Sequence, residues 1–348
     1  MKKYSFVIVS ASALALFLVF SMTPQGRESV ADALIICAKR LVPSLFISVC
    51  ASVFLMKSGL YAYIPKKLSD ITGKLFGIPP EASSAVIIGF SCGFPSGAIA
   101  VSSLYGKKLI SEYDARRLAA ISSVPSPTFI IGYVGSELLE SALLGVGLYF
   151  SVVLSSLTLG IFTARGQGKL SENIPKTKPE ILSSIAPSIA QSVLKTVTLC
   201  GFVIFFSAFA KMLSMPFSHS KIISYAVYSA FEISKASVLL SSLSDVGIAL
   251  VALSATLAFS GFSAIFQVIS VTDFPIGEYI KLKAVSAVLS AAFSFVLFFC
   301  RFQIAVFLFA AYFAFLFFGK KLIHSRKYKQ NSEHNPKNIA FDMPHENR

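Results

Sequence analysis

The sequence predicts an all-α polytopic membrane protein with about eight to ten transmembrane or re-entrant helices. Hydrophobic residues make up 55% of the 348 residues, and the mean hydropathy is +0.72, well above the range of soluble domains. Charged residues make up only 14% and lie at the ends of long charge-free intervals, because a charge is costly in lipid. These intervals lack the period-two alternation of membrane β-strands, so they favour helices.

Charge-free intervals mark the expected spans in chain order. They are Ser5–Met22, Leu41–Met56, Ala82–Gly106, Leu118–Ser136, Ser141–Ala164, Thr196–Ala210, Val246–Thr272, Ala284–Cys300 and Phe302–Gly319. The segment Ile222–Ser244 contains Glu232 and Lys235, so we expect either a functional helix or a re-entrant piece there.

The spans divide the chain into five regions. Residues 1–28 have a basic start and an apolar centre without a good cleavage site, which favours a retained signal anchor. Residues 29–164 are expected to form a first membrane half, and residues 181–319 a second half with a last transmembrane helix. The segment 165–180 contains Gly, Pro and Lys, as a cytoplasmic linker does, and the basic tail 320–348 is expected to be disordered and cytoplasmic.

The distribution of basic residues predicts the topology. The basic start, linker and tail place both termini in the cytoplasm. The loop 136–141 contains Glu137 and Glu140 but no basic residue, so it is expected outside. The two halves then have opposite orientation, as in inverted-repeat transporters with broken helices. A weak internal similarity between Phe90–Ser96 and Phe259–Ser263 supports a repeat.

Several function classes find no support in the sequence. The net charge of +14 comes from residues that flank apolar runs, which indicates membrane topology and no nucleic-acid partner. Five cysteines without a C-x-x-C pair indicate neither a disulfide framework nor a metal site, and no cofactor is expected. Gly89-x-Ser91-x-Gly93 matches a nucleophile elbow, but the strand and the histidine that it needs are missing, so an enzyme is not expected.

The first candidate site is the cluster Gly93-Phe94-Pro95-Ser96-Gly97, with Ser91 just before it. Proline removes a backbone donor, so the cluster is expected to break the helix within the membrane and to expose N–H groups that bind an anion. Alternatively, glycines spaced four apart let helices pack closely.

A second break is expected at Ser123, Pro125, Ser126 and Thr128, because two prolines two residues apart cannot lie in a continuous helix. The hydroxyl groups would contact either the substrate or the freed carbonyl groups. A kink compensated by neighbouring helices is the alternative.

The second half offers Ser260, Ser263 and Gln267 as weaker counterparts, together with Glu232 and Lys235. The glutamate and the lysine, three residues apart, could neutralise each other. Alternatively, the lysine faces a substrate carboxylate and the glutamate takes part in proton or ion coupling.

The ordered motifs resemble one family. They are Gly89-x3-Gly93-Phe94-Pro95-x-Gly97, Leu109-Ile110-Ser111 with Glu112, Asp114 and Arg117-Leu118, and Ser123-x2-Ser126-Pro127-x-Phe129-Ile130-x-Gly132. Together they resemble the sporulation integral membrane protein YlbJ family, whose core is a nucleoside-recognition or gate domain. The resemblance covers about residues 40–165, and it reaches the second half mainly through Phe259–Ser263 and Gln267.

The resemblance implies a multi-pass protein of spore-forming bacteria that moves dipicolinate (pyridine-2,6-dicarboxylate) across the outer forespore membrane. Its partners would be a small anionic substrate, the lipid bilayer, and further copies of the chain or other sporulation membrane proteins. Two alternatives remain open, a carrier for nucleosides or other small metabolites and a non-transporting sporulation scaffold.

Overall fold

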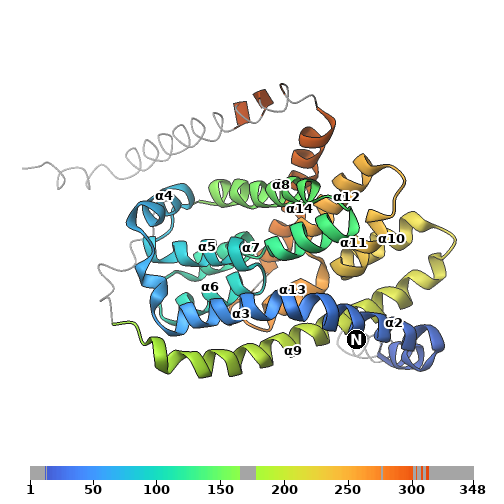
Figure 1. Cartoon of the computed structure of the whole chain (residues 1–348), viewed down its shortest axis with the longest axis horizontal. Helices are drawn as coiled ribbons and strands as arrows, with labels where there is room; N and C mark the ends of the chain where they lie inside the picture. Colours follow the sequence, from blue (N-terminus) through green and yellow to red (C-terminus); the bar gives the residue numbers. More distant parts are fainter. Residues whose placement is uncertain are drawn as a thin grey trace, which may run out of the picture. The chain divides into compact units, whose positions relative to one another are not determined.

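The computed structural model describes residues 12, 14–164, 178–275, 277–300, 303, 307, 308, 311 and 312. All regular structure in these residues is helical (Figure 1), so the predicted all-α fold is confirmed. Helices up to Phe299 form one compact unit, and the chain from Cys300 belongs to a second one. Most of the expected linker, most of the last helix and the whole basic tail lie outside the described residues.

The first half begins with α2 and ends with α8. Its helices are α2 (Pro24–Ile36), the π-helix η1 (Cys37–Leu41), α3 (Val42–Lys57), η2 (Leu60–Tyr63), α4 (Lys66–Phe76), η3 (Pro80–Ala82), α5 (Ser83–Cys92), α6 (Ser96–Gly106), α7 (Glu112–Ser122), the π-helix η4 (Thr128–Leu138) and α8 (Ala142–Phe162).

The second half begins with the long helix α9, which runs beside α2 and α3 (Figure 1). Its helices are α9 (Ile181–Ser214), η5 (Met215–Phe217), α10 (Lys221–Phe231), α11 (Ile233–Ser241), α12 (Val246–Phe259), α13 (Gly261–Ile269) and α14 (Gly277–Phe299).

Four helical segments in the described part are long and apolar enough to cross a membrane. They are Ala142–Phe162, Ile181–Phe217, Val246–Ile269 and Gly277–Phe299. A fifth span is formed if the helix pair Pro24–Leu41 and Leu45–Lys57, which is bent by 58°, crosses the membrane as one. The other expected spans are divided into short helices, α5 with α6 and α7 with η4. The larger number expected from the sequence therefore includes pieces too short to cross alone.

The two halves have the same order of elements. In each half a long helix, α3 or α9, precedes two broken helix pairs and a final long helix, α8 or α14. This order pairs the break at Pro95 with the break at Glu232, and the break at residues 123–127 with the break at Ser260. The similarity between Phe90–Ser96 and Phe259–Ser263 pairs different breaks, because small residues recur wherever the chain turns tightly.

Small polar residues join the large apolar ones in the interior of the bundle. Ser155 Oγ and Ser286 Oγ join α8 to α14 at 2.7 Å, and Ser254 Oγ and Ser290 Oγ join α12 to α14 at 2.6 Å. On α9, every fourth residue from Ser184 to Thr196 is buried. Its large apolar residues are exposed, at Leu182, Ile185, Ile189, Val193, Leu194 and Val197. Such a distribution is typical of membrane helices, which approach each other through small residues.

Candidate functional site at four helix breaks

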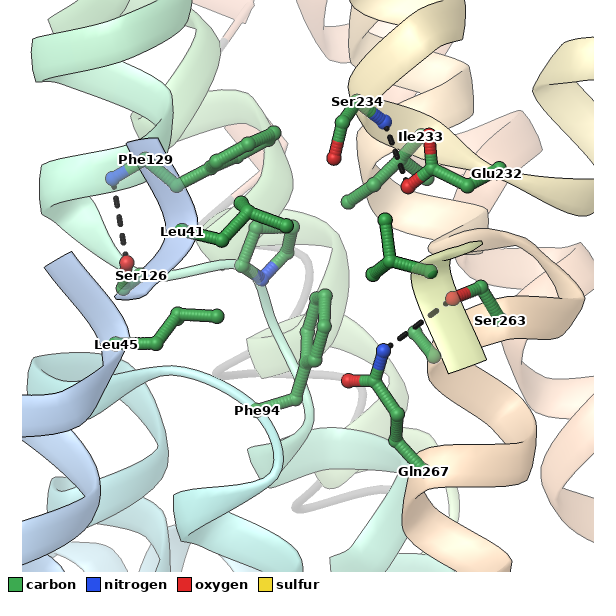
Figure 2. Close-up of a pocket in the computed structure, with 13 residues that line it drawn as sticks. Leu41, Leu45, Phe94, Ser126, Phe129, Glu232, Ile233, Ser234, Ser263 and Gln267 are labelled. Atoms are coloured by element: carbon green, nitrogen blue, oxygen red, sulfur yellow. Dashed lines mark hydrogen bonds between the residues drawn. The ribbon is translucent and has the colours of Figure 1, made fainter. Parts of the chain in front are cut away.

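One pocket lies where the broken helices of both halves meet (Figure 2). Its volume is about 30 Å³, which is room for roughly one water molecule, so a larger ligand must widen it. The lining residues are Leu41, Leu45, Phe94, Pro125, Ser126, Phe129, Val203, Glu232, Ile233, Ser234, Ser263, Ala264 and Gln267. Five residues of the sequence-predicted site therefore lie together, namely Pro125, Ser126, Glu232, Ser263 and Gln267.

The two breaks of the first half cross each other beside the pocket. The backbone N–H of Phe94 donates to the carbonyl of Val124 at 2.8 Å. Gly93 has a φ of +78°, and a Cβ built there would lie 2.5 Å from the backbone nitrogen of Ser126. A Cβ at Gly97 would lie 2.3 Å from the carbonyl oxygen of Ser122. These glycines are therefore needed for close packing, as the alternative interpretation of the cluster expected, and they support the pocket wall from behind.

The two breaks of the second half also pack against each other. Ser260 and Gly261 both have a φ of +71°, which turns the chain between α12 and α13. A Cβ at Gly261 would lie 3.2 Å from the carbonyl oxygen of Phe231 at the end of α10. The Ser260 hydroxyl is buried and donates to the carbonyl of Leu257 at 3.0 Å, so it stabilises the turn and does not line the pocket.

Glu232 is both a pocket residue and a helix cap. It is only 1% exposed, and its extended backbone separates α10 from α11. Its carboxylate accepts hydrogen bonds from the backbone N–H groups of Ser234 at 3.0 Å and Lys235 at 2.8 Å. These are the N–H groups that a helix start leaves without partners. The donors at α11 are therefore already bonded, contrary to the expectation that this kind of break leaves them free for an anion.

The other three helix starts differ in how they are capped. The Ser126 hydroxyl accepts from the backbone N–H of Phe129 at 3.2 Å and lies 2.9 Å from the hydroxyl of Thr128, so η4 is capped. Neither α6 nor α13 has a side-chain cap. On α13 the Gln267 amide nitrogen donates to the Ser263 hydroxyl at 3.3 Å, while its buried amide oxygen has no partner. The pocket therefore offers the uncapped start of α13 and an amide group, whereas no residue of α6 lines it.

Lys235 does not belong to the pocket, which corrects the expectation that it faces a substrate carboxylate. Its Nζ lies 3.0 Å from Asp32 Oδ2 on α2, and its side chain is 33% exposed. It lines a different, polar pocket with Glu28 and Lys211. The alternative expectation, that Glu232 and Lys235 neutralise each other, finds no direct contact between the side chains. The glutamate carboxylate caps the start of α11, and Lys235 Nζ pairs with Asp32.

Four further predicted residues lie near the breaks and outside the pocket lining. Ser91 is exposed near the end of α5, and Pro95 is buried at the start of α6. Ser96 is buried, and its hydroxyl lies 3.5 Å from the carbonyl of Ser48 on α3. Ser123 is fully buried at the end of α7. These residues shape the breaks but do not line the cavity.

Lys283 is the residue that the sequence analysis missed. It is fully buried within α14, and its Nζ donates to the carbonyl of Ser123 at 2.7 Å. In the sequence Lys283 follows Lys281 and directly precedes the charge-free interval Ala284–Cys300, so it resembles a charge that flanks a membrane span. The signal was present, because Tyr279 and Lys283 are four residues apart and therefore share a helix face with each other.

Comparison with curated proteins finds a distant relative. The chain is 26% identical over 196 residues to the "Sporulation integral membrane protein YlbJ" of Bacillus subtilis (strain 168). The aligned part covers 50% of this chain and 48% of the relative, so the chain spans about half the length of the relative that it matches. No family model and no solved structure matches the chain. The protein is therefore a membrane protein with distant homology to YlbJ.

Proposed function

We propose that this protein transports a small planar dicarboxylate, dipicolinate in the first instance, across a membrane of a sporulating cell. The observation that carries the proposal is the convergence of four chain breaks on one pocket inside a helical membrane bundle. Transporters commonly bind their substrates where discontinuous helices meet near the middle of the bilayer. The relative's name supplies the link to sporulation.

The pocket contains groups that suit a flat, polar-edged ring. Phe94 and Phe129 both line it (Figure 2). A planar ligand would lie between these rings, and the hydroxyls of Ser126 and Ser263 would donate to its carboxylates. The uncapped start of α13 adds backbone donors and the positive end of a helix dipole.

The binding of a dianion depends on the protonation state of Glu232. A second carboxylate entering the pocket beside this buried acid is repelled unless the acid is neutral. We therefore assign it a coupling role, in which Glu232 takes up one proton from solvent when the dianion binds and releases it when the dianion leaves.

A neutral nucleoside is the second candidate substrate, and one observation favours it. Glu232 and the unpartnered amide oxygen of Gln267 are both acceptors, and they match the N–H groups of a base better than they match an anion. The third possibility is a scaffold without transport. Such a protein does not require broken helices that converge on a pocket, so this observation does not support it.

Uptake by proteoliposomes that contain the full chain tests these possibilities. Wild-type protein should accumulate labelled dipicolinate and exclude labelled nucleosides. Ser126→Ala should weaken dipicolinate binding by about one hydrogen bond, roughly 0.5–1.5 kcal/mol. Ser242→Ala is the control, because that exposed hydroxyl bonds only to the carbonyl of Leu239 in the described structure.

Glu232→Gln tests coupling in the same vesicles. It keeps an acceptor for one N–H group of α11, so the protein should insert, but dipicolinate uptake should lose its dependence on a proton gradient. Nucleoside uptake in place of dipicolinate uptake would establish the second candidate. A correctly inserted protein that moves neither solute would contradict transport altogether.

A further inference from the structure

Lys283 is a buried lysine that has no carboxylate partner among the described residues. Its side chain is fully buried in α14, and the four ion pairs found among the described residues all involve other bases. An unpaired charge is expensive in a low-dielectric interior, so such a residue within a membrane segment calls for a functional explanation.

The groups around Lys283 are rich in donors. The hydroxyl groups of Ser123 and Tyr279 are both buried, and neither bonds to a described group outside this pair. Tyr279 lies one turn before Lys283 on the same face of α14, and Ser123 provides the carbonyl that the ammonium group contacts. One amine nitrogen and two hydroxyls therefore gather around a single carbonyl acceptor, which concentrates hydrogen-bond donors in this region.

Lys283 contacts the same chain segment, residues 123–127, that lines the pocket through Pro125 and Ser126. Ser123 begins the second break, and Ser126, three residues later, contributes to the pocket wall. Three residues span at most about 11 Å. At such a distance a charge still acts strongly where little water or salt intervenes.

A simple structural role exists for the lysine. In a continuous helix the carbonyl of Ser123 would accept from the backbone nitrogen of residue 127, but Pro127 has no N–H group. Lys283 supplies the missing donor. A neutral glutamine or asparagine could do the same, so the positive charge exceeds what this role requires.

We propose that Lys283 determines specificity, because its charge gives the pocket the positive potential that selects dianionic over neutral solutes. It takes the place that the sequence analysis gave to Lys235, which faces Asp32 instead. The inference rests on the proposed function. The charge of Lys283 acts on the ligand from the far side of residues 123–127, without contacting it.

Equilibrium binding to the full-length protein in lipid nanodiscs tests the proposal with two ligands of similar shape. Dipicolinate is the dianion, and pyridine-2,6-dicarboxamide is the neutral counterpart. Lys283→Gln keeps a donor for the Ser123 carbonyl and removes the charge. It should weaken dipicolinate binding at least tenfold and change diamide binding less than twofold. Lys283→Arg should keep the preference for the dianion.

Controls separate charge from folding. Lys281→Gln removes an exposed charge from the same helix and should leave both affinities unchanged. Thermal unfolding confirms that each variant is folded, and Lys283→Met replaces the glutamine variant if that variant does not insert.

Three outcomes would overturn the inference. A glutamine variant that still prefers dipicolinate shows that the lysine only satisfies the carbonyl. Equal losses for both ligands show that it only positions Ser126. A wild-type protein that binds the diamide as well as dipicolinate, or binds neither, refutes the proposed function itself and the inference with it.

Discussion

Replacing Gly93 with alanine tests whether the crossing of the first two breaks is rigid. Gly93 has a φ of +78° and a ψ of −172°, a region essentially confined to glycine, where another residue costs roughly 1–3 kcal/mol. The new Cβ would also lie 2.5 Å from the nitrogen and 2.7 Å from the Cα of Ser126, so this backbone must move. Overpacking of that kind costs about 1–3 kcal/mol. The expected loss of stability is therefore about 2–6 kcal/mol.

Gly59 provides a control for positive φ without crowding, although its ψ of 0° places it in the left-handed α region. It has a φ of +81°, but a Cβ there would have no neighbour within 4 Å. Gly59→Ala should therefore lose only the backbone contribution, about 1–2 kcal/mol. Thermal unfolding in detergent measures both variants, and dipicolinate binding should weaken only in Gly93→Ala, because Ser126 lines the pocket. Equal losses of stability with unchanged binding in both variants would refute the rigid crossing.

Three other changes test the rest of the structure. Arg117→Met removes a buried ion-pair partner that also bonds two loop carbonyls, so unfolding experiments should show a loss of about 3–5 kcal/mol. Lys235→Gln should cost less than about 1 kcal/mol and leave dipicolinate binding unchanged, because the pair with Asp32 is exposed and lies outside the pocket. A single cysteine at Gln167 should react with an impermeant thiol reagent from the side opposite to one at Ser136, and labelling from the same side would contradict the topology.

The sequence was most informative where a local rule decides the structure. Proline disfavours a helix interior, so the breaks at Pro95 and Pro125 could be predicted, with Pro95 between glycines and Pro125 two residues before another proline. A single proline does not suffice, because Pro187 lies inside α9. Intramembrane charge is rare, so Glu232 stood out as a site candidate, and it does line the pocket. Its role as a cap could not be predicted, because the sequence did not show that one helix ends and another begins at this residue.

Long-range contacts were beyond the reach of local patterns. Lys235 pairs with Asp32, about two hundred positions earlier in the chain, and Lys283 bonds a carbonyl on α7. Both lysines look alike in the sequence, each near the end of an apolar segment. Only the packing of α14 and α2 against their neighbours distinguishes the buried cation from the exposed one.

The length of α9 makes the bilayer itself relevant to the pocket. Its 34 residues extend roughly 51 Å, whereas the hydrocarbon core is about 30 Å thick. Its exposed apolar side chains run from Leu182 to Phe205, so a tilted orientation keeps more of them in lipid. Val203 on this helix lines the pocket. Hydrophobic mismatch, through the acyl-chain length of the surrounding lipids, therefore changes the tilt of α9 and with it one wall of the site.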